Sequence, residues 1–448
     1  MPTIQSLNPS CTTPGGLKQL TVVGQNFVTG SVVRWNGSDL TTSNDGNVGG
    51  LTATVPASDV AKNGSAKITV FNPAPGGGSS KPQTLTITSA GIDPQSIAVD
   101  PAGKFAYVAN MGCDGEGSVS MYTINPTSGA LTAIAPPVPS YDELTDAVTV
   151  DPSGKFVYVA SSGDVWDIDS GSIAAYAINP RTGALTYTTG GTNGGWTSGS
   201  PSYFNSLAVD PAGKFVYAAD GGASPAGSFG GANTVSMFTI NGVTGALTAV
   251  GTITAGASPV SVAVHPSGKF VYAVDQNDVP DAVGSVSMYA INAKTGALGH
   301  IGKVAAGGYP ISMTVDPLGR FAYVTNFGGH DVSMYTVDAT TGVLAFIGSI
   351  AAGKDPVSVA VDPTGRFVYV VNLTGYSSTG SVSMYTIDAA TGGLTNVGTI
   401  ATKIAPTSIA IHPSGKYVYV TNSGSNSVSM YGVDGDTGIL KLMGIVGT

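Results

Sequence analysis

The stretch Ser96-Ile97-Ala98-Val99-Asp100-Pro101-Ala102-Gly103-Lys104-Phe105-Ala106-Tyr107-Val108 decides the fold, because close copies of it recur to the end of the chain. Each copy joins two runs of β-forming residues through Asp-Pro-x-Gly or His-Pro-x-Gly, whose residues favour a tight turn. We call the first residue of this turn the anchor. It recurs at intervals of 46 to 59 residues, at Asp100, Asp151, Asp210, His265, Asp316, Asp362 and His412.

Two further strand-like runs complete each copy. One resembles Ser-Val-Ser-Met-Tyr, and the other follows a Thr-Gly or Ser-Gly pair that suits a turn with positive φ. Four strands in a repeat of this length are typical of one β-propeller blade, and seven blades close a ring. Because the last copy holds four runs of its own, ending near Ile445, we expect no strand exchange between the chain ends.

The first part of the chain has a different pattern. Short alternating runs at 20–23, 31–35, 51–55, 66–71 and 84–88 are separated by turn residues, which predicts a β-sandwich with Trp35 in its core. The sequence therefore predicts an all-β protein: an immunoglobulin-like β-sandwich over 1–89, followed by a seven-bladed β-propeller of four-stranded blades over 94–448.

Both parts resemble known families. Gly-Gln-Asn-Phe at 24–27, Val-Arg-Trp-Asn-Gly at 33–37 and Asn-Pro-Ala-Pro-Gly-Gly-Gly at 72–78 resemble an IPT/TIG-type domain, which implies a spacer or attachment module. Tyr-Val-Ala-Asn at 107–110 and Tyr-Val-Thr-Asn at 323–326 and 419–422 resemble the YVTN repeat family.

The repeated part is also similar to the 6-phosphogluconolactonase-like propellers. This resemblance implies either a sugar-lactone hydrolase or a surface protein without known activity. Fold alone does not choose between these two functions, because one propeller fold carries many of them.

Charge and hydropathy exclude several classes of partner. The chain has 18 Lys+Arg against 27 Asp+Glu, a net charge of −9, which disfavours nucleic acid and anionic lipid. No apolar run reaches the roughly 20 residues of a membrane span, so we expect no membrane insertion. The Gly-, Ser- and Thr-rich composition favours an extracellular or cell-surface protein, although this chain shows no signal peptide.

Two cysteines, Cys11 and Cys113, fall in different predicted domains. Two cysteines cannot make a disulfide framework, and the simpler interpretation is two unrelated thiols. A single bridge between the domains is the alternative.

One face of the propeller is predicted to carry the variable loops. The loops between second and third strands, and the links between blades, emerge opposite the anchor turns. They are long and acidic in the first four copies, and long loops that depart from the repeat are the natural binding region. The predicted ligand-binding residues are Trp166, Trp196, Tyr203, Asp146, Asp220 and Asp275, since aromatic faces beside carboxylates suit a saccharide. The alternative is that the aromatic rings only hold the loops.

Asp164, Asp167 and Asp169 place several oxygen ligands in one loop, which makes them candidate calcium ligands. The alternative is solvated loop carboxylates, so no cofactor is certain. For catalysis, His330 is the histidine expected on the variable face, with Asp331 beside it, and they are the candidate general base pair.

The opposite face is predicted to carry a basic ring, four residues after each anchor: Lys104, Lys155, Lys214, Lys269, Arg320, Arg366 and Lys416. We expect these side chains to be solvated and paired with the anchors, or to contact an acidic surface. The favoured function is an exported, non-catalytic binding or scaffolding propeller with a protein partner, including head-to-tail self-association. A metal-independent lactone hydrolase and a saccharide-binding module are the alternatives.

Overall fold

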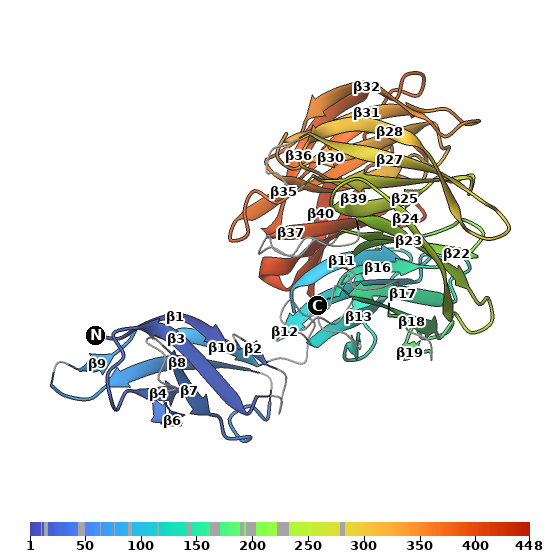
Figure 1. The fold of residues 1–448 in the computed structure, drawn as a ribbon. Coiled ribbons are helices and arrows are strands. Elements are labelled where there is room, and N and C mark those ends of the chain that lie inside the picture. Colours follow the sequence, from blue (N-terminus) through green and yellow to red (C-terminus); the bar gives the residue numbers. More distant parts are fainter. Residues whose placement is uncertain are drawn as a thin grey trace. The chain divides into compact units, whose positions relative to one another are not determined.

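The computed structural model describes residues 1–9, 11–12, 17–43, 50–62, 64–75, 77–87, 92–113, 116–140, 145–161, 171–188, 192–193, 203–221, 233–277 and 283–448. Their contacts divide the chain into two units, Met1–Ala90 with Cys113–Glu116, and Gly91–Gly112 with Gly117–Thr448. Both units consist of strands (Figure 1), and the described residues include one short 3₁₀ helix, Ser423–Ser425. No helix in this part of the chain has the length and apolar character of a membrane span. The predicted all-β fold is confirmed.

The first unit is a sandwich of two sheets. One sheet has the order β1 (Thr3–Asn8), β3 (Gln19–Gln25), β7 (Gly50–Thr54) and β6 (Thr41–Ser43). The other has the order β2 (Cys11–Thr12), β10 (Gln83–Ile87), β8 (Gly64–Asn72), β4 (Val32–Trp35) and β5 (Ser38–Asp39), with β9 (Gly78–Ser79) beside β8.

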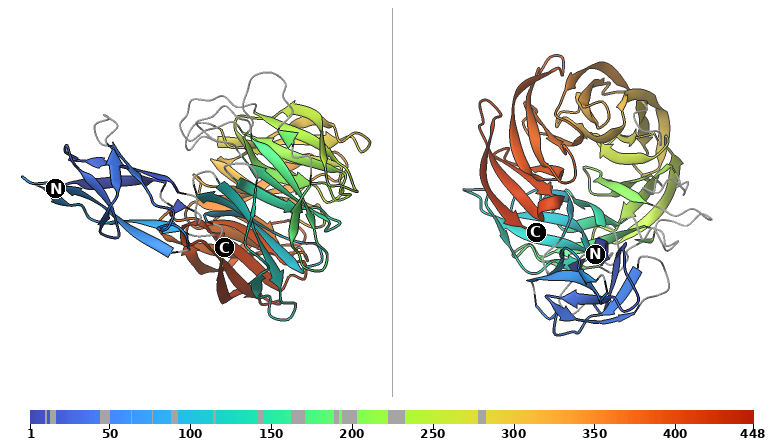
Figure 2. Two further views of the ribbon diagram at one scale, coloured as in Figure 1. Left: turned by 90° about the horizontal axis from the view of Figure 1, so that it is seen from below. Right: turned by 90° about the vertical axis from the view of Figure 1, so that its left-hand side faces the viewer.

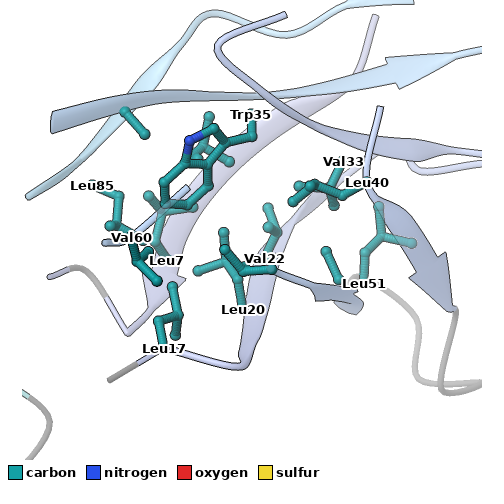
Figure 3. Close-up of a cluster of buried hydrophobic side chains, with 14 of the residues drawn as sticks. Leu7, Leu17, Leu20, Val22, Val33, Trp35, Leu40, Leu51, Val60 and Leu85 are labelled. Atoms are coloured by element: carbon teal, nitrogen blue, oxygen red, sulfur yellow. The ribbon is translucent and has the colours of Figure 1, made fainter. Parts of the chain in front are cut away.

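The sandwich core follows from strand alternation. Leu20 and Val22 of β3 are fully buried while their neighbours face outward, as the two-residue period of a strand requires. They pack with Trp35, which is 5% exposed, and with further aliphatic side chains (Figure 3). Trp35 is a core residue, as predicted.

Cys11 corrects one interpretation. It is disulfide-bonded in β2, so it is not one of two unrelated thiols. Cys113 is the only other cysteine of the chain. The sequence could not reveal this bond, because a disulfide requires its two Cα atoms to lie within about 7 Å, which only the fold determines.

The second unit consists of seven antiparallel sheets, and each keeps its four main strands in chain order. Blades 1 and 2 consist of β11 (Pro94–Val99), β12 (Phe105–Cys113), β13 (Glu116–Ile124) and β14 (Leu131–Ala133), and of β16 (Thr145–Val150), β17 (Phe156–Ser161), β18 (Ser172–Ile178) and β19 (Leu185–Tyr187). Blades 3 and 4 consist of β21 (Phe204–Val209), β22 (Phe215–Asp220), β23 (Thr234–Ile240) and β24 (Leu247–Thr254), and of β25 (Pro259–Val264), β26 (Phe270–Asp275), β27 (Val283–Ile291) and β28 (Leu298–Gly308). Blades 5, 6 and 7 consist of β29 (Pro310–Val315), β30 (Phe321–Asn326), β31 (Asp331–Val337) and β32 (Leu344–Ala351); of β33 (Pro356–Val361), β34 (Phe367–Asn372), β35 (Thr379–Ile387) and β36 (Leu394–Ile404); and of β37 (Pro406–Ile411), β38 (Tyr417–Asn422), β39 (Ser427–Val433) and β40 (Leu440–Gly447). Short strands β15 (Val138–Pro139) and β20 (Thr192–Asn193) pair with β13 and β18.

The ring closes between its first and last blades. β11 lies against β37, and the red strands of blade 7 sit beside the light-blue strands of blade 1 (Figure 2). One buried cluster joins Ile97 and Val108 of blade 1 to Tyr419 and Val428 of blade 7. Each of the two blades is built from its own four strands, so the predicted absence of strand exchange is confirmed.

The same aromatic contact joins each blade to the next. A tyrosine of the second strand donates a hydrogen bond to the glycine carbonyl in the following blade's turn between third and fourth strands. That glycine has positive φ and touches an aromatic ring: a Cβ on Gly183 would lie 2.3 Å from Cδ1 of Phe105. The pairs, at 2.9 to 3.1 Å, are Tyr107–Gly183, Tyr158–Gly245, Tyr217–Gly296, Tyr272–Gly342, Tyr323–Gly392, Tyr369–Gly438 and Tyr419–Gly129.

The anchors stabilise their own turns rather than the basic ring. Oδ1 of Asp151 accepts the backbone N–H groups of Lys155 and Phe156, both at 2.7 Å, and its carbonyl accepts the N–H of Gly154. Among the described residues, one ring side chain makes an ion pair with its anchor: Nε of Arg320 lies 3.7 Å from Oδ2 of Asp316. The expected pairing is therefore the exception.

The two histidine anchors have an additional role. Nε2 of His265 donates to the carbonyl of Gly319 in blade 5, and Nε2 of His412 donates to the carbonyl of Gly103 in blade 1, both at 2.9 Å. A histidine at the anchor thus adds a hydrogen bond to the next blade.

Candidate functional site

On the face opposite the anchor turns, the residue before the first strand of a blade holds the loop that follows the second strand, in each of the six blades where both segments are described. Its carbonyl oxygen accepts the N–H of the first loop residue; Tyr309 accepts from Phe327 and Asp355 from Leu373, both at 2.9 Å. We call this residue the link residue. In five of the described links it has a φ of 50° to 57°, at Asp93, Ser258, Tyr309, Asp355 and Ala405. A repeated backbone thus presents aspartate, serine, tyrosine or alanine at this position of the described blades.

His330 and Asp355 meet on this face, between blades 5 and 6. His330 ends the turn 327–330, and its Nδ1 accepts the backbone N–H of Asp355 at 3.2 Å. Nδ1 also lies 3.5 Å from Oδ1 of Asp355. A ring nitrogen that accepts a hydrogen bond carries no proton, so neutral His330 has its proton on Nε2. The side chain is 48% exposed, so this proton can be donated to a ligand.

Asp355 also faces a cation. Its Oδ2 lies 3.8 Å from Nζ of Lys354, and its side chain is 14% exposed against 63% for Lys354. His330, Lys354 and Asp355 therefore form an ionisable group with a mostly buried carboxylate at its centre.

Asp331, predicted to act with His330, has a different partner. Its Oδ1 accepts a hydrogen bond of 2.6 Å from Nδ2 of Asn326, and the two residues pair across the hairpin. Asp331 is partly exposed and adjoins His330 at the end of the turn. Asp331 therefore directly follows the turn that His330 ends, but the carboxylate that contacts the imidazole belongs to Asp355. A catalytic role for His330 and Asp331 stays a prediction.

Asp355 and Lys354 were missed because they are distant from His330 in the sequence. The available signal was positional: Asp355 precedes Pro356 as Tyr309 precedes Pro310, at the start of an inner strand. The contact itself depends on the positive φ values of His330 and Asp355, 53° and 55°, which the residue types do not announce.

Two aromatic rings lie on the same turn and link. The ring centroids of Tyr309 and Phe327 are 5.9 Å apart and their planes are inclined by 58°. Both side chains are partly exposed. This pair was not predicted, because the sequence analysis sought aromatic residues in the long loops of blades 1 to 4.

Asp275 ends the second strand of blade 4, where four other blades have asparagine. It is 2% exposed. Oδ1 accepts the N–H of Gly256 at 2.8 Å, and Oδ2 accepts the hydroxyls of Ser285 and Ser287 at 2.9 and 2.6 Å. Burial raises the pKa of this carboxyl despite these hydrogen bonds. Both oxygens are engaged inside the blade, and the ligand-binding role of Asp275 stays a prediction.

Asp220 holds the same position in blade 3. It is 1% exposed, and its Oδ1 accepts the backbone N–H of Tyr203 at 3.0 Å. Tyr203 is itself 8% exposed. The two residues predicted as parts of a ligand site thus fix the link into blade 3. Their ligand contacts stay predictions, as does that of Asp146, which lies partly exposed in β16.

The remaining predicted ligands lie outside the described residues: Trp166, Trp196, Asp164, Asp167 and Asp169. The saccharide and calcium hypotheses for these residues stay predictions. Within the described ranges, no group of three or more His, Cys, Asp or Glu side chains is arranged to hold a metal ion.

The fold and this face define a class of protein: a propeller preceded by an immunoglobulin-like domain, with an ionisable group on its variable side. The sequence pattern of the family described as "Lactonase, 7-bladed beta-propeller" matches residues 60–230, 223–352 and 345–446. The chain belongs to this lactonase family. Residues 2–87 match the IPT/TIG domain pattern. Both predicted resemblances are confirmed.

Solved structures share the propeller fold. A putative 6-phosphogluconolactonase from Bacteroides fragilis superposes with a TM-score of 0.58 at 21% identity, covering 75% of this chain and 92% of that one. The periplasmic gluconolactonase PpgL of Pseudomonas aeruginosa superposes with a TM-score of 0.61 at 19% identity, covering 74% and 93%. At these identities the similarity shows the fold alone.

A curated relative matches a shorter segment. The 6-phosphogluconolactonase of Formosa agariphila is 40% identical over 65 residues, which is 14% of this chain and 18% of the relative. The chain therefore spans less than a fifth of the length of that relative in the match.

Proposed function

We propose that this protein hydrolyses lactones at a site made of the turn 327–330, Asp331, Lys354 and the link residue Asp355. Membership of the lactonase family and the gluconolactonase names of its relatives support this reaction class. The observation that carries the proposal is the contact between His330 and Asp355, which holds a half-exposed proton donor 3.5 Å from a mostly buried carboxylate.

Lactone hydrolysis forms a bond between water and the carbonyl carbon and breaks the ring C–O bond. We assign the water proton to the carboxylate of Asp331. In protonated His330, Nδ1–H turns from the backbone N–H of Asp355 to Oδ1 of the same residue, which lies 3.5 Å away. The ring then gives its Nε2 proton to the departing ring oxygen and becomes neutral. Lys354 adds positive charge beside the oxyanion of the tetrahedral intermediate. Exchange with solvent then returns the proton from Asp331 to His330.

The test is hydrolysis of D-glucono-1,5-lactone and its 6-phosphate, followed by base consumption above the spontaneous rate. We expect His330→Gln and Asp331→Asn each to lower kcat by about 100-fold or more, the usual contribution of acid–base catalysis. His300→Gln is the matched control, because His300 is exposed on β28 and packs edge-on to Tyr289, with ring centroids 5.7 Å apart. Turnover that survives His330→Gln unchanged, or no turnover with either lactone, contradicts the proposal.

The competing proposal is the scaffolding function predicted from the sequence. It requires the basic ring of one molecule to meet the acidic variable face of the next, with self-association or a surface protein as partner. Lys104 and Lys416 lie on turns of that basic face. If neither lactone is hydrolysed, the molecular mass of the protein is measured by light scattering at low and high salt. A mass that rises at low salt supports scaffolding, whereas a constant monomer mass argues against it.

We also propose that the protein acts outside the cytoplasm, as an extracellular or cell-surface protein. The disulfide at Cys11 supports this location, because structural disulfides persist mainly in oxidising compartments. The measurement is recovery of the protein in extracellular and surface fractions of its producing cells.

A further inference from the structure

The face that carries the anchor turns is divided by charge. We define this anchor face as the anchor turns together with the turns between third and fourth strands, all of whose residues are described. In blades 1 to 4, the acidic residues of these turns are the anchors alone, and they are buried. The basic residues of the same four blades are exposed: Lys104, Lys155, Lys214, Lys269, Arg181 and Lys294. These adjacent blades form the positive half of the face.

The rest of the anchor face, in blades 5 to 7, is negative. Its turns between third and fourth strands begin with aspartate, where those of blades 1 to 4 begin with asparagine. The acidic residues of these turns are exposed: Asp338, Asp388, Asp434 and Asp436. They outnumber the basic residues of this half, Arg320, Arg366 and Lys416. When the buried anchors are included, the two halves carry opposite excess charge, and the whole face holds as many acidic as basic residues.

The two arginines of the negative half have contacts within that half. Nη1 of Arg320 donates to the carbonyl of Ala389 at 2.9 Å, and Arg366 donates to the carbonyl of Gly435. Each guanidinium also lies over the phenylalanine that follows it, 4.9 and 4.8 Å from the ring centroid. In the positive half, the basic side chains make no ion pair with another described residue. The charges left for a partner are therefore positive in one half and negative in the other.

This division makes the anchor face complementary to itself. If two copies meet through a two-fold axis that runs along the division, the positive half of each copy lies against the negative half of the other. The chain has a net charge of −9, so two copies repel each other over most of their surface. The anchor face is balanced in charge, and that general repulsion is absent there.

The anchor face also exposes apolar side chains that a second copy can cover. Val243 in blade 3 is 89% exposed, and Leu318 in blade 5 is 66% exposed. An exposed proline follows every anchor: Pro101, Pro152, Pro211, Pro266, Pro317, Pro363 and Pro413. Apolar side chains that gather on one face are typical of an interaction surface, because their burial favours association.

The charges also select the position of the axis. An axis that passes between blades 4 and 5 continues through blade 1, because the ring has seven blades, and it sets blade 2 against blade 7 and blade 3 against blade 6. An axis between blades 7 and 1 would instead set blade 4 against itself, with Lys269 and Lys294 facing their own copies. The first axis avoids this repulsion.

We propose that the anchor face is the interface of a dimer of this chain, in which blade 2 of each copy meets blade 7 of the other. Arg181 then lies near Asp436 of the partner subunit, because both residues belong to turns between third and fourth strands and lie at similar distances from the centre of the ring. This interface is closed, unlike a head-to-tail assembly, and it does not depend on the proposed hydrolase function.

The first test is the mass of the full chain in light scattering at low salt, as its concentration rises. We expect a plateau at twice the mass of the chain, and a weaker dimer at high salt because the charges are screened. A constant monomer mass overturns the proposal. A mass that keeps rising without a plateau also overturns it, since an open head-to-tail assembly has no closed end state.

The second test exchanges the charges of Arg181 and Asp436, whose side chains are exposed. Arg181→Glu and Asp436→Lys should each weaken the dimer about tenfold, because an attraction becomes a repulsion at two places in the dimer. The double variant should restore the dimer. Lys403→Glu makes the same change of charge near the other end of blade 6, at the end of β36, and is the control that should dimerise normally.

Unfolding midpoints establish that all four variants fold. Single variants that dimerise as tightly as the unaltered chain reject the anchor face as the interface. A double variant that stays monomeric, although it folds, rejects the contact between blades 2 and 7.

Discussion

The phenolic hydroxyl of Tyr419 in blade 7 donates a hydrogen bond of 2.9 Å to the carbonyl oxygen of Gly129 in blade 1. The same tyrosine–glycine bond occurs at the other joints of the ring. The closing joint is therefore made like the others, by side-chain burial and one hydrogen bond. Among the described strands, none from one end of the propeller completes the sheet of the other end.

Tyr419→Phe should destabilise the propeller by about 1 to 3 kcal/mol, because the carbonyl of Gly129 loses its buried donor. Tyr272→Phe removes the equivalent bond to Gly342, which is 3.0 Å long, at an interior joint. Urea unfolding should give similar losses for the two variants. A loss at Tyr272 with none at Tyr419 would show that another contact holds the closing joint.

Gly438→Ala should be more damaging. Gly438 has a φ of 75°, and an added Cβ would lie 2.4 Å from Cδ1 of Phe367. Left-handed strain and overpacking together cost about 2 to 4 kcal/mol. Gly435→Ala, three residues earlier, is the control, because no atom lies within 4 Å of its added Cβ. Equal unfolding free energies for the two variants would contradict this account of the Thr-Gly turn.

The repeat could be predicted because its signals are local. Asp-Pro-x-Gly and Thr-Gly specify turns by residue type, and the continuous apolar run from Phe105 to Ala109 specifies a strand that is buried on both faces. What the sequence did not show is that the tyrosine and the glycine are two halves of one contact. Tyr107 and Gly183 lie 76 positions apart and meet only when the blades close into a ring.

The site was harder to predict, for two physical reasons. Length and acidity directed attention to the loops of blades 1 to 4, yet Asp220 and Asp275 align with the asparagine of Tyr-Val-Thr-Asn and are buried there. Asp355 looks like an ordinary loop acid in the sequence. Its position beside His330 follows from two left-handed residues on different segments.

Alkaline pH should destabilise the propeller because the tyrosines of its third strands are buried. Burial raises the pKa of Tyr122, Tyr289, Tyr335 and Tyr431 to about 12. The folded state thus holds the phenolic proton more tightly than the unfolded chain, whose tyrosines titrate near pH 10. Their stabilising contribution is complete below about pH 10 and is lost as pH rises toward about 12.

The measurement is the free energy of unfolding in urea as pH rises, with phenolate absorbance recorded on the same samples. Tyr335→Phe removes one of these protons and should make the decline with pH shallower. Phenolate absorbance equal to the ionisation of all 19 tyrosines near pH 10, in protein that stays fully folded, would contradict the buried, protonated state of these residues.

Asp275→Asn should stabilise the propeller at neutral pH. Burial raises the pKa of the Asp275 carboxyl, so its contribution to stability is complete below the unfolded pKa and is lost as pH rises through the folded pKa. An asparagine has no charge to bury, keeps an acceptor for Gly256, and can donate to Ser287 as Asn326 donates to Ser333 at 2.9 Å. The unfolding free energy of the variant should therefore exceed that of the unaltered chain near pH 7, and the difference should shrink as pH falls through the acidic range. The same variant tests the ligand-binding role predicted from the sequence: unchanged glycoside binding assigns Asp275 to the scaffold, whereas lost binding in a protein of higher stability returns it to the site.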